Sequence, residues 1–154
     1  MDWVRGRRIP MAQSQLQMVA DWERQKEQKL VQDFQLAQQF AQDNKQKLSG
    51  LENYRLDYLR EAQLRAKQGV GSVTFGQHQQ FIGKLDKACE MQLHTLNQAV
   101  RVADQRRMLW MAQQRKRKAV EMLLDKQHKA KLKREDKLEQ IMLDELSLQK
   151  FMRK

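Results

Sequence analysis

Apolar residues recur along this chain at alternating steps of three and four residues, the spacing that places side chains on one stripe of a helix. Starting at Phe34, these steps reach Ala37, Ala41, Asn44, Leu48, Leu51, Arg55, Tyr58 and Ala62. Starting at Ile82, they reach Leu85, Cys89, Gln92, Leu96, Ala99, Ala103, Arg106 and Trp110. Polar residues interrupt both series. The pattern therefore predicts two long helices that pack along a narrow and imperfect coiled-coil seam.

One segment breaks the helical pattern. The stretch "QGVGSVTFG", residues 68–76, holds three of the six glycines together with β-branched residues, and such clusters mark loops. We therefore expect a first helix over about 13–67, a loop over about 68–76 and a second helix over about 77–151. One loop between two long helices predicts an all-α fold, an antiparallel coiled-coil hairpin.

The two ends of the chain lie outside this pattern. Residues 1–12 are expected to form a disordered N-terminal arm, or an extension of a chain that starts at Met11, and residues 152–154 a disordered tail. No apolar run approaches the ~20 residues of a membrane-spanning helix. The basic start "MDWVRGRRIP" lacks the apolar stretch of a signal peptide. The sequence therefore predicts a soluble, intracellular protein.

Charge narrows the classes of partner. Charged residues make up 32% of the chain and the net charge is +11, which favours acidic partners such as nucleic acid, an anionic membrane or an acidic protein surface. Two basic runs, "RKRK" at 115–118 and "KQHKAKLKREDK" at 126–137, lie in the last third. No aromatic residue interleaves the first run and acidic residues are mixed into the second. We therefore expect no nucleic acid and leave open a solvated helix face or an acidic protein partner.

The residues that could carry out chemistry are widely separated. His78, His94 and His128 lie far apart, and none forms a close motif with Cys89 or matches a known catalytic or metal-binding pattern. A thin hairpin also lacks the concave pocket that catalysis requires. We expect a non-enzymatic protein without a cofactor or a metal. Cys89, the single cysteine, is expected to pack on the seam as a small apolar residue.

The only two tyrosines, Tyr54 and Tyr58, lie four residues apart on one face of the first helix. We call the residues at this height of the hairpin the aromatic stripe. It comprises Lys47, Leu51, Tyr54 and Tyr58 on the first helix, and Phe81, Leu85, Ala88 and Gln92 on the second. Two interpretations are open: the two halves face each other as seam, or they lie side by side as an outward patch with aromatic anchors for a partner.

The stretch "LEQIMLDELSLQKFM" near the C-terminus is amphipathic. Leu138, Ile141 and Met142 fall near one of its faces. If the hairpin pairs in register, this face is expected to meet the region around Leu16, Val19 and Trp22. The paired ends then form an elongated tip with exposed Met, Leu and Trp side chains, which adapt well to a partner.

These residues carry a resemblance. Leu51, Tyr54 and Tyr58 form the pattern "L..Y...Y", and "QQFI..L.KA" follows the loop as Gln79, Gln80, Phe81, Ile82, Leu85, Lys87 and Ala88. With the start "MAQSQLQMVADW" from Met11 and the basic helical tail, the chain resembles the FliJ family, the soluble stalk component of the bacterial flagellar type III export apparatus, over about residues 11–154.

The resemblance implies an antiparallel coiled coil similar to the central stalk of rotary ATP synthases. Such a stalk inserts into the hexameric export ATPase, contacts the cytoplasmic part of the membrane-embedded export gate and handles export chaperones. The resemblance places gate binding on six residues of the aromatic stripe: Leu51, Tyr54, Tyr58, Phe81, Leu85 and Ala88. Lys47 and Gln92 match two further family positions but depart from the amide and imidazole expected there.

The resemblance also places the ATPase contact at the paired ends, which include Leu16, Val19, Trp22, Leu138, Ile141 and Met142. It implies a cytoplasmic protein at the inner face of the membrane, held there through its partners at the flagellar base. Two alternatives remain: the equivalent stalk of a virulence-type secretion system, and a basic helical hairpin that binds nucleic acid.

Overall fold

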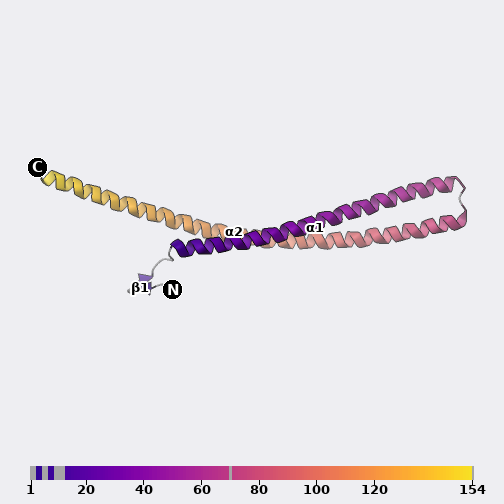
Figure 1. Ribbon diagram of the computed structural model, residues 1–154, viewed down its shortest axis with the longest axis horizontal. Coiled ribbons are helices and arrows are strands. Elements are labelled where there is room, and N and C mark those ends of the chain that lie inside the picture. The colour runs from indigo at the N-terminus through magenta and orange to yellow at the C-terminus, as the bar shows by residue number, and fades with distance from the viewer. Residues whose placement is uncertain (1–2, 5–6, 9–12, 70, 154) are drawn as a thin grey trace. The chain divides into compact units, whose positions relative to one another are not determined.

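The computed structural model describes residues 3–4, 7–8, 13–69 and 71–153. Two helices dominate it: α1 runs over Gln13–Lys67 and α2 over Ser72–Met152. The protein is all-α, with the two helices packed against each other as a hairpin (Figure 1), which confirms the predicted fold class. Two short strands, β1 (Trp3–Val4) and β2 (Arg7–Arg8), form an antiparallel pair. They fall within residues 1–12, and the other residues of that expected arm lie outside the described ones.

The loop between the helices is shorter than the sequence predicts. α1 ends at Lys67, and Gly69 follows with a φ of 80°, a left-handed conformation that favours glycine. α2 already begins at Ser72, so the expected loop over 68–76 and the expected start near residue 77 are wrong. The backbone N–H of Phe75 donates to the carbonyl of Gly71 at 3.2 Å. Val73 and Thr74 thus join the first turn of α2, since the helix penalty of β-branched residues is small.

The chain divides into two compact units, which are described separately. The loop unit comprises Lys29–Trp110, and the terminal unit comprises Met1–Gln28 with Met111–Lys154. Among the described residues, no helix is long and apolar enough to cross a membrane.

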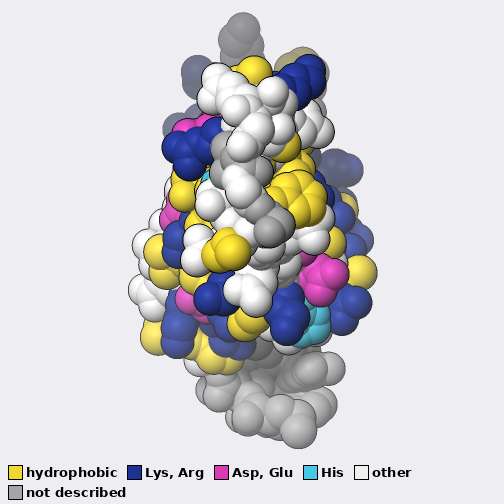
Figure 2. Space-filling model, turned by 90° about the vertical axis from the view of Figure 1, so that its right-hand side faces the viewer, with side chains coloured by type: hydrophobic (Ala, Val, Ile, Leu, Met, Phe, Trp, Pro, Cys, Tyr) yellow, Lys and Arg dark blue, Asp and Glu magenta, His cyan; other side chains and the backbone are white. Residues whose placement is uncertain are grey.

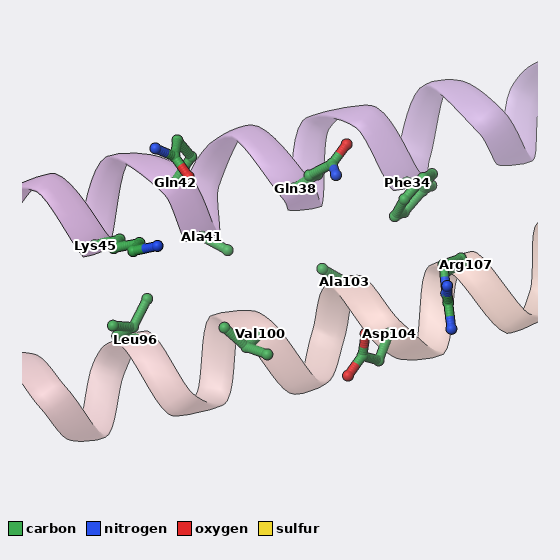
Figure 3. Close-up of a pocket in the computed structure, with 10 residues that line it drawn as sticks. All are labelled: Phe34, Gln38, Ala41, Gln42, Lys45, Leu96, Val100, Ala103, Asp104 and Arg107. Carbon is green, nitrogen blue, oxygen red and sulfur yellow. The ribbon is translucent and has the colours of Figure 1, made fainter.

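In the loop unit, α1 and α2 run antiparallel and meet along the seam that the sequence predicts. Its buried apolar side chains are small or medium in size: Ala41, Leu48, Leu85, Ala99 and Ala103. The rings of Phe34 and Trp110 stack at 5.6 Å between centroids. Figure 3 shows Ala41 on α1 and Leu96 and Ala103 on α2 directed toward the space between the helices. Arg106, placed on the seam by the sequence pattern, is exposed instead.

In the terminal unit, the start of α1 pairs with the first part of the α2 segment. Leu16 and Ala20 are buried there, and Glu23 accepts a hydrogen bond from Gln113. A shallow groove brings Gln13 and Gln17 beside His128. Because α1 begins at Gln13, this pairing ends near His128, and every side chain from His128 to Arg153 is exposed.

This register corrects the expected tip. Leu138, Ile141 and Met142 lie beyond the paired part of α2 and do not meet Leu16 and Val19. The physical reason is the closure point of the hairpin. A turn at Gly69 places Glu23 opposite Gln113, so a residue near 138 has no counterpart within α1. α2 itself ends at Met152, Arg153 forms a turn, and Lys154 lies outside the described residues.

Candidate functional site

Four rings gather in the loop unit where the aromatic stripe approaches the loop. We call Tyr54, Tyr58, His78 and Phe81 the aromatic cluster. The ring of Phe81 lies 4.6 Å from that of Tyr58 and 6.3 Å from that of Tyr54, between centroids. The Tyr54–Phe81 contact is edge-on, with an interplanar angle of 82°, a geometry that aromatic pairs prefer. The ring of Phe81 on α2 thus contacts both tyrosines of α1.

The two tyrosines have different environments, which answers the question that the sequence left open. Tyr58 is half-buried on the seam, and its hydroxyl shares a hydrogen bond of 2.6 Å with Nδ1 of His78. Tyr54 is 51% exposed although its ring edge is held against Phe81. The cluster therefore contains a packing tyrosine and an outward-facing one. Tyr54 combines exposure with a fixed orientation, which costs a partner little entropy on binding.

Sequence reasoning missed the part that His78 plays. Its ring lies 5.3 Å from that of Tyr58, and its Nε2 is buried without a hydrogen-bond partner among the described residues. The available signal was spacing, since His78 precedes Phe81 by three residues on α2 and so shares its face. The expected loop over 68–76 obscured this signal because it placed His78 at the frayed start of the helix.

The remaining stripe residues do not form one continuous outward patch. Leu85 is only 7% exposed and belongs to the core, while Leu51 and Ala88 are half-buried. Lys47 is exposed. Gln92 turns inward, and its Nε2 donates to Oδ1 of Asn44 at 2.9 Å. The stripe is thus partly seam, and its accessible aromatic feature is Tyr54.

Polar side chains cross the seam in both units. In the loop unit, Arg55 pairs with Asp86. In the terminal unit, Arg117 pairs with Glu27 and with Glu121, whose Oε2 lies 2.8 Å from Nη1 of the arginine. The hydrogen bond to Glu27 is the main cause that raises the pKa of Arg117. These layers tie the helices together in one register without a continuous apolar core.

Glu121 is the acidic centre of the terminal network. Its Oε1 accepts a hydrogen bond of 2.8 Å from Nε of Arg24 on α1. This bond is the main cause that lowers the pKa of the Glu121 carboxyl, and Arg117 lowers it further. Glu121 therefore stays ionised and links the two helices near the end of their paired part.

The residues proposed for the ATPase contact divide between two environments. Leu16 is buried and Val19 half-buried in the paired part of the terminal unit, whereas Trp22 is 55% exposed with the Nζ of Lys26 lying 3.3 Å from its ring centroid. The other three lie in the unpaired segment of α2. Leu138 is 60% exposed, Ile141 53% and Met142 64%.

The basic run at 115–118 is not uniformly exposed. Arg115, Lys116 and Lys118 are exposed, but Arg117 is half-buried in its ion pairs. Figure 2 looks onto the side of the α1–α2 loop rather than onto this run, and there dark blue Lys and Arg side chains are scattered among yellow hydrophobic ones. The positive charge on this face is therefore dispersed.

The described residues form shallow grooves. A shallow groove in the loop unit lies along the seam between Phe34 and Leu96 (Figure 3). Cys89 is a free, half-buried thiol beside a second groove. His94 and His128 are exposed. Within the described part of the chain, no group of three or more His, Cys, Asp or Glu could hold a metal ion.

Comparison with known proteins gives one match. The family model described as "Flagellar FliJ protein" matches residues 12–154. No curated protein and no solved structure matches the chain.

Proposed function

Because the chain belongs to the family of flagellar FliJ proteins, a non-enzymatic component of flagellar protein export, we propose that it acts there as a stalk that links two partners. One partner is the hexameric export ATPase, into which the terminal unit inserts. The other is the cytoplasmic part of the export gate, which contacts the aromatic cluster. Hydrolysis of ATP belongs to the ATPase, and this chain transmits the resulting change to the gate and handles export chaperones.

The observation that carries the gate contact is the position of Tyr54. Large aromatic side chains that are exposed yet fixed serve as anchors at protein interfaces, and Tyr54 is 51% exposed while packed edge-on against Phe81. Tyr58 and Phe81 support it from the seam. Leu51, about one turn before Tyr54 on α1, and Ala88 on α2 are both half-buried. Leu85 contributes by holding the helices together beneath the surface.

The terminal unit supports the ATPase contact through its exposed apolar side chains. Trp22 on α1 and Leu138, Ile141 and Met142 on α2 are all more than half exposed. Methionine and leucine on a helix adapt to an apolar partner surface. In this role the chain works at the inner face of the cell membrane, where it is held through its partners.

Two binding measurements test this proposal. Purified chain is mixed with the purified export ATPase under conditions in which the ATPase forms its ring, and separately with the cytoplasmic part of the gate protein. We expect both to bind, and Trp22→Ala with Ile141→Ala to weaken only the ATPase complex. A failure of the wild-type chain to bind either partner, while remaining helical by circular dichroism, contradicts the stalk role.

A cellular readout complements the binding data. Cells that lack the native gene are supplied with either wild-type chain or Tyr54→Ala, and motility is measured on soft agar. We expect Tyr54→Ala to reduce motility at an unchanged protein level. Phe40→Ala is the matched control, since Phe40 is also exposed on α1 (58%) and lies outside the cluster. Equal motility of both variants contradicts the assignment of Tyr54.

A further inference from the structure

The last part of α2 continues as helix after its partner ends. We call residues 129–152 the unpaired segment. All of its side chains are exposed, and among the described residues no hydrogen bond or ion pair joins it to α1. Most of the stability of a helix in a protein comes from packing of its apolar face rather than from intrinsic propensity.

The seam of α2 runs on into this segment without a change of phase. In the paired part, the half-buried or buried positions step through Trp110, Gln113, Arg117, Val120, Leu124 and Gln127. The same steps of three and four continue through Lys131, Arg134, Leu138, Ile141, Glu145, Leu148 and Met152. Four of these last five positions are apolar, so a coiled-coil face is present, and none of the described helices lies opposite it.

We propose that a second copy of this chain covers the face, with the two unpaired segments packed antiparallel as a homodimer. In the register that we infer, Leu138 of one copy lies opposite Ile141 of the other, and Arg134 lies opposite Glu145. Twofold symmetry then repeats each contact. The proposal does not depend on the export role of the chain.

Charge favours the antiparallel direction. The first half of the segment, residues 129–137, has five basic and two acidic side chains, whereas residues 138–152 have three acidic and one basic. Antiparallel pairing places the basic half of each copy against the acidic half of the other. Parallel pairing places like charge against like charge along the whole contact, which is unfavourable.

An oppositely charged pair on the seam selects the register. Arg134 and Glu145 both occupy seam positions, and only the Leu138–Ile141 register places them opposite each other. The third charged seam residue, Lys131, then lies opposite Leu148, where its aliphatic stem packs while its ammonium group reaches solvent. A shift by one heptad in either direction sets Arg134 against an apolar residue, which is Leu138 or Met152 of the other copy. The same register brings Lys137 beside Asp144 at the flank of the seam, where coiled coils set partner choice.

The dimer is expected to be weak. Its contact spans about 18 residues of helix per copy, or ~27 Å at 1.5 Å per residue, and each copy carries a net charge of +11 that opposes association. Salt near 0.15 M limits that repulsion to a range of ~8 Å. The free chain would then hide its apolar face in the dimer and expose it on dissociation.

Sedimentation equilibrium of the full chain from about 1 μM to about 1 mM at this salt concentration tests the proposal. We expect a monomer–dimer equilibrium for the wild type. Arg134→Glu alone and Glu145→Arg alone each set like charges opposite each other, so each should weaken the dimer at least tenfold. An equal mixture of the two variants restores opposite charges at both contacts, so the mixture should dimerise as tightly as the wild type.

Two control variants separate this contact from general effects. Glu139→Arg changes the charge as much as Glu145→Arg but lies off the seam, and it should dimerise like the wild type. Leu143→Ala removes an exposed leucine (57%) from the opposite face and should have no effect, whereas Leu138→Ala should weaken the dimer. Helicity is checked by circular dichroism. A wild type that stays monomeric throughout, or a mixture no tighter than its components, overturns the proposal.

Discussion

Substitution of Asn44, which is hydrogen-bonded to Gln92 across the seam, tests how the seam is stabilised. Asn44 is 4% exposed. Its Nδ2 donates to the carbonyl of Phe40 at 2.8 Å, and its Oδ1 accepts from Nε2 of Gln92 at 2.9 Å. Asn44→Ala removes both bonds, each worth about 0.5–1.5 kcal/mol net. The substitution should therefore destabilise the chain by about 1–3 kcal/mol.

Replacing both partners should have the opposite sign. Asn44→Leu with Gln92→Leu leaves no unpaired polar group in the seam and gives it a leucine layer next to Leu48. Burial of two leucines contributes about 3–6 kcal/mol, from which the lost hydrogen bonds subtract about 1–3 kcal/mol. We expect a net gain of about 0–5 kcal/mol, at a cost in register specificity, since buried polar pairs fix the register of coiled coils.

Urea unfolding followed by circular dichroism measures both changes. With a slope of about 1–3 kcal/mol per molar urea, a gain of about 2 kcal/mol moves the midpoint upward by roughly 1 M. Gln42→Leu is the matched control, because Gln42 is exposed on α1 and its change should stay within about 0.5 kcal/mol. A double variant less stable than the wild type refutes the reasoning, since it would make the polar pair the better seam contact.

Two further predictions concern the aromatic cluster and the terminal network. Tyr58→Ala should lower the free energy of unfolding by about 2–4 kcal/mol, as for a packed aromatic side chain. Tyr54→Ala, at an exposed position, should lower it by less than about 1 kcal/mol. Thermal unfolding measures both changes, and equal losses would contradict the different burial of the two side chains. The lowered pKa of Glu121 stabilises the folded chain above the unfolded carboxyl pKa of about 4.3. The stability advantage over Glu121→Gln should therefore shrink as pH falls through the folded-state pKa in acid, and an advantage that persists unchanged to pH 2 contradicts the ion pairing with Arg24.

The periodic pattern predicted the hairpin because the spacing of apolar residues along each helix determines which side chains lie on its seam. Ala41, Leu48, Ala99 and Ala103 lie where the steps of three and four place them. Arg106 departs from the pattern, since all side chains between Ala103 and Trp110 are exposed. Helix periodicity is a property of neighbouring residues, which explains why it can be read from the sequence.

Features that depend on where the two helices stop were harder to predict. The loop proved shorter because Gly69 supplies a left-handed turn and α2 already begins at Ser72. The tip residues Leu138 and Ile141 lack an α1 counterpart because α1 starts at Gln13. The position of Phe81 was needed to tell which tyrosine faces outward. Its contact with Tyr54 joins two helices, and periodicity within one helix cannot predict such a contact.

The export gate contact of Tyr54 is the central claim, and isothermal titration tests it most directly. The cytoplasmic part of the gate protein is titrated with wild-type chain, Tyr54→Ala and the control Phe40→Ala, each shown to be equally helical. We predict at least tenfold weaker binding for Tyr54→Ala, as expected for loss of an aromatic anchor worth about 1.4 kcal/mol or more, and unchanged binding for Phe40→Ala. Wild-type affinity in Tyr54→Ala, or an equal loss in both variants, would contradict the account.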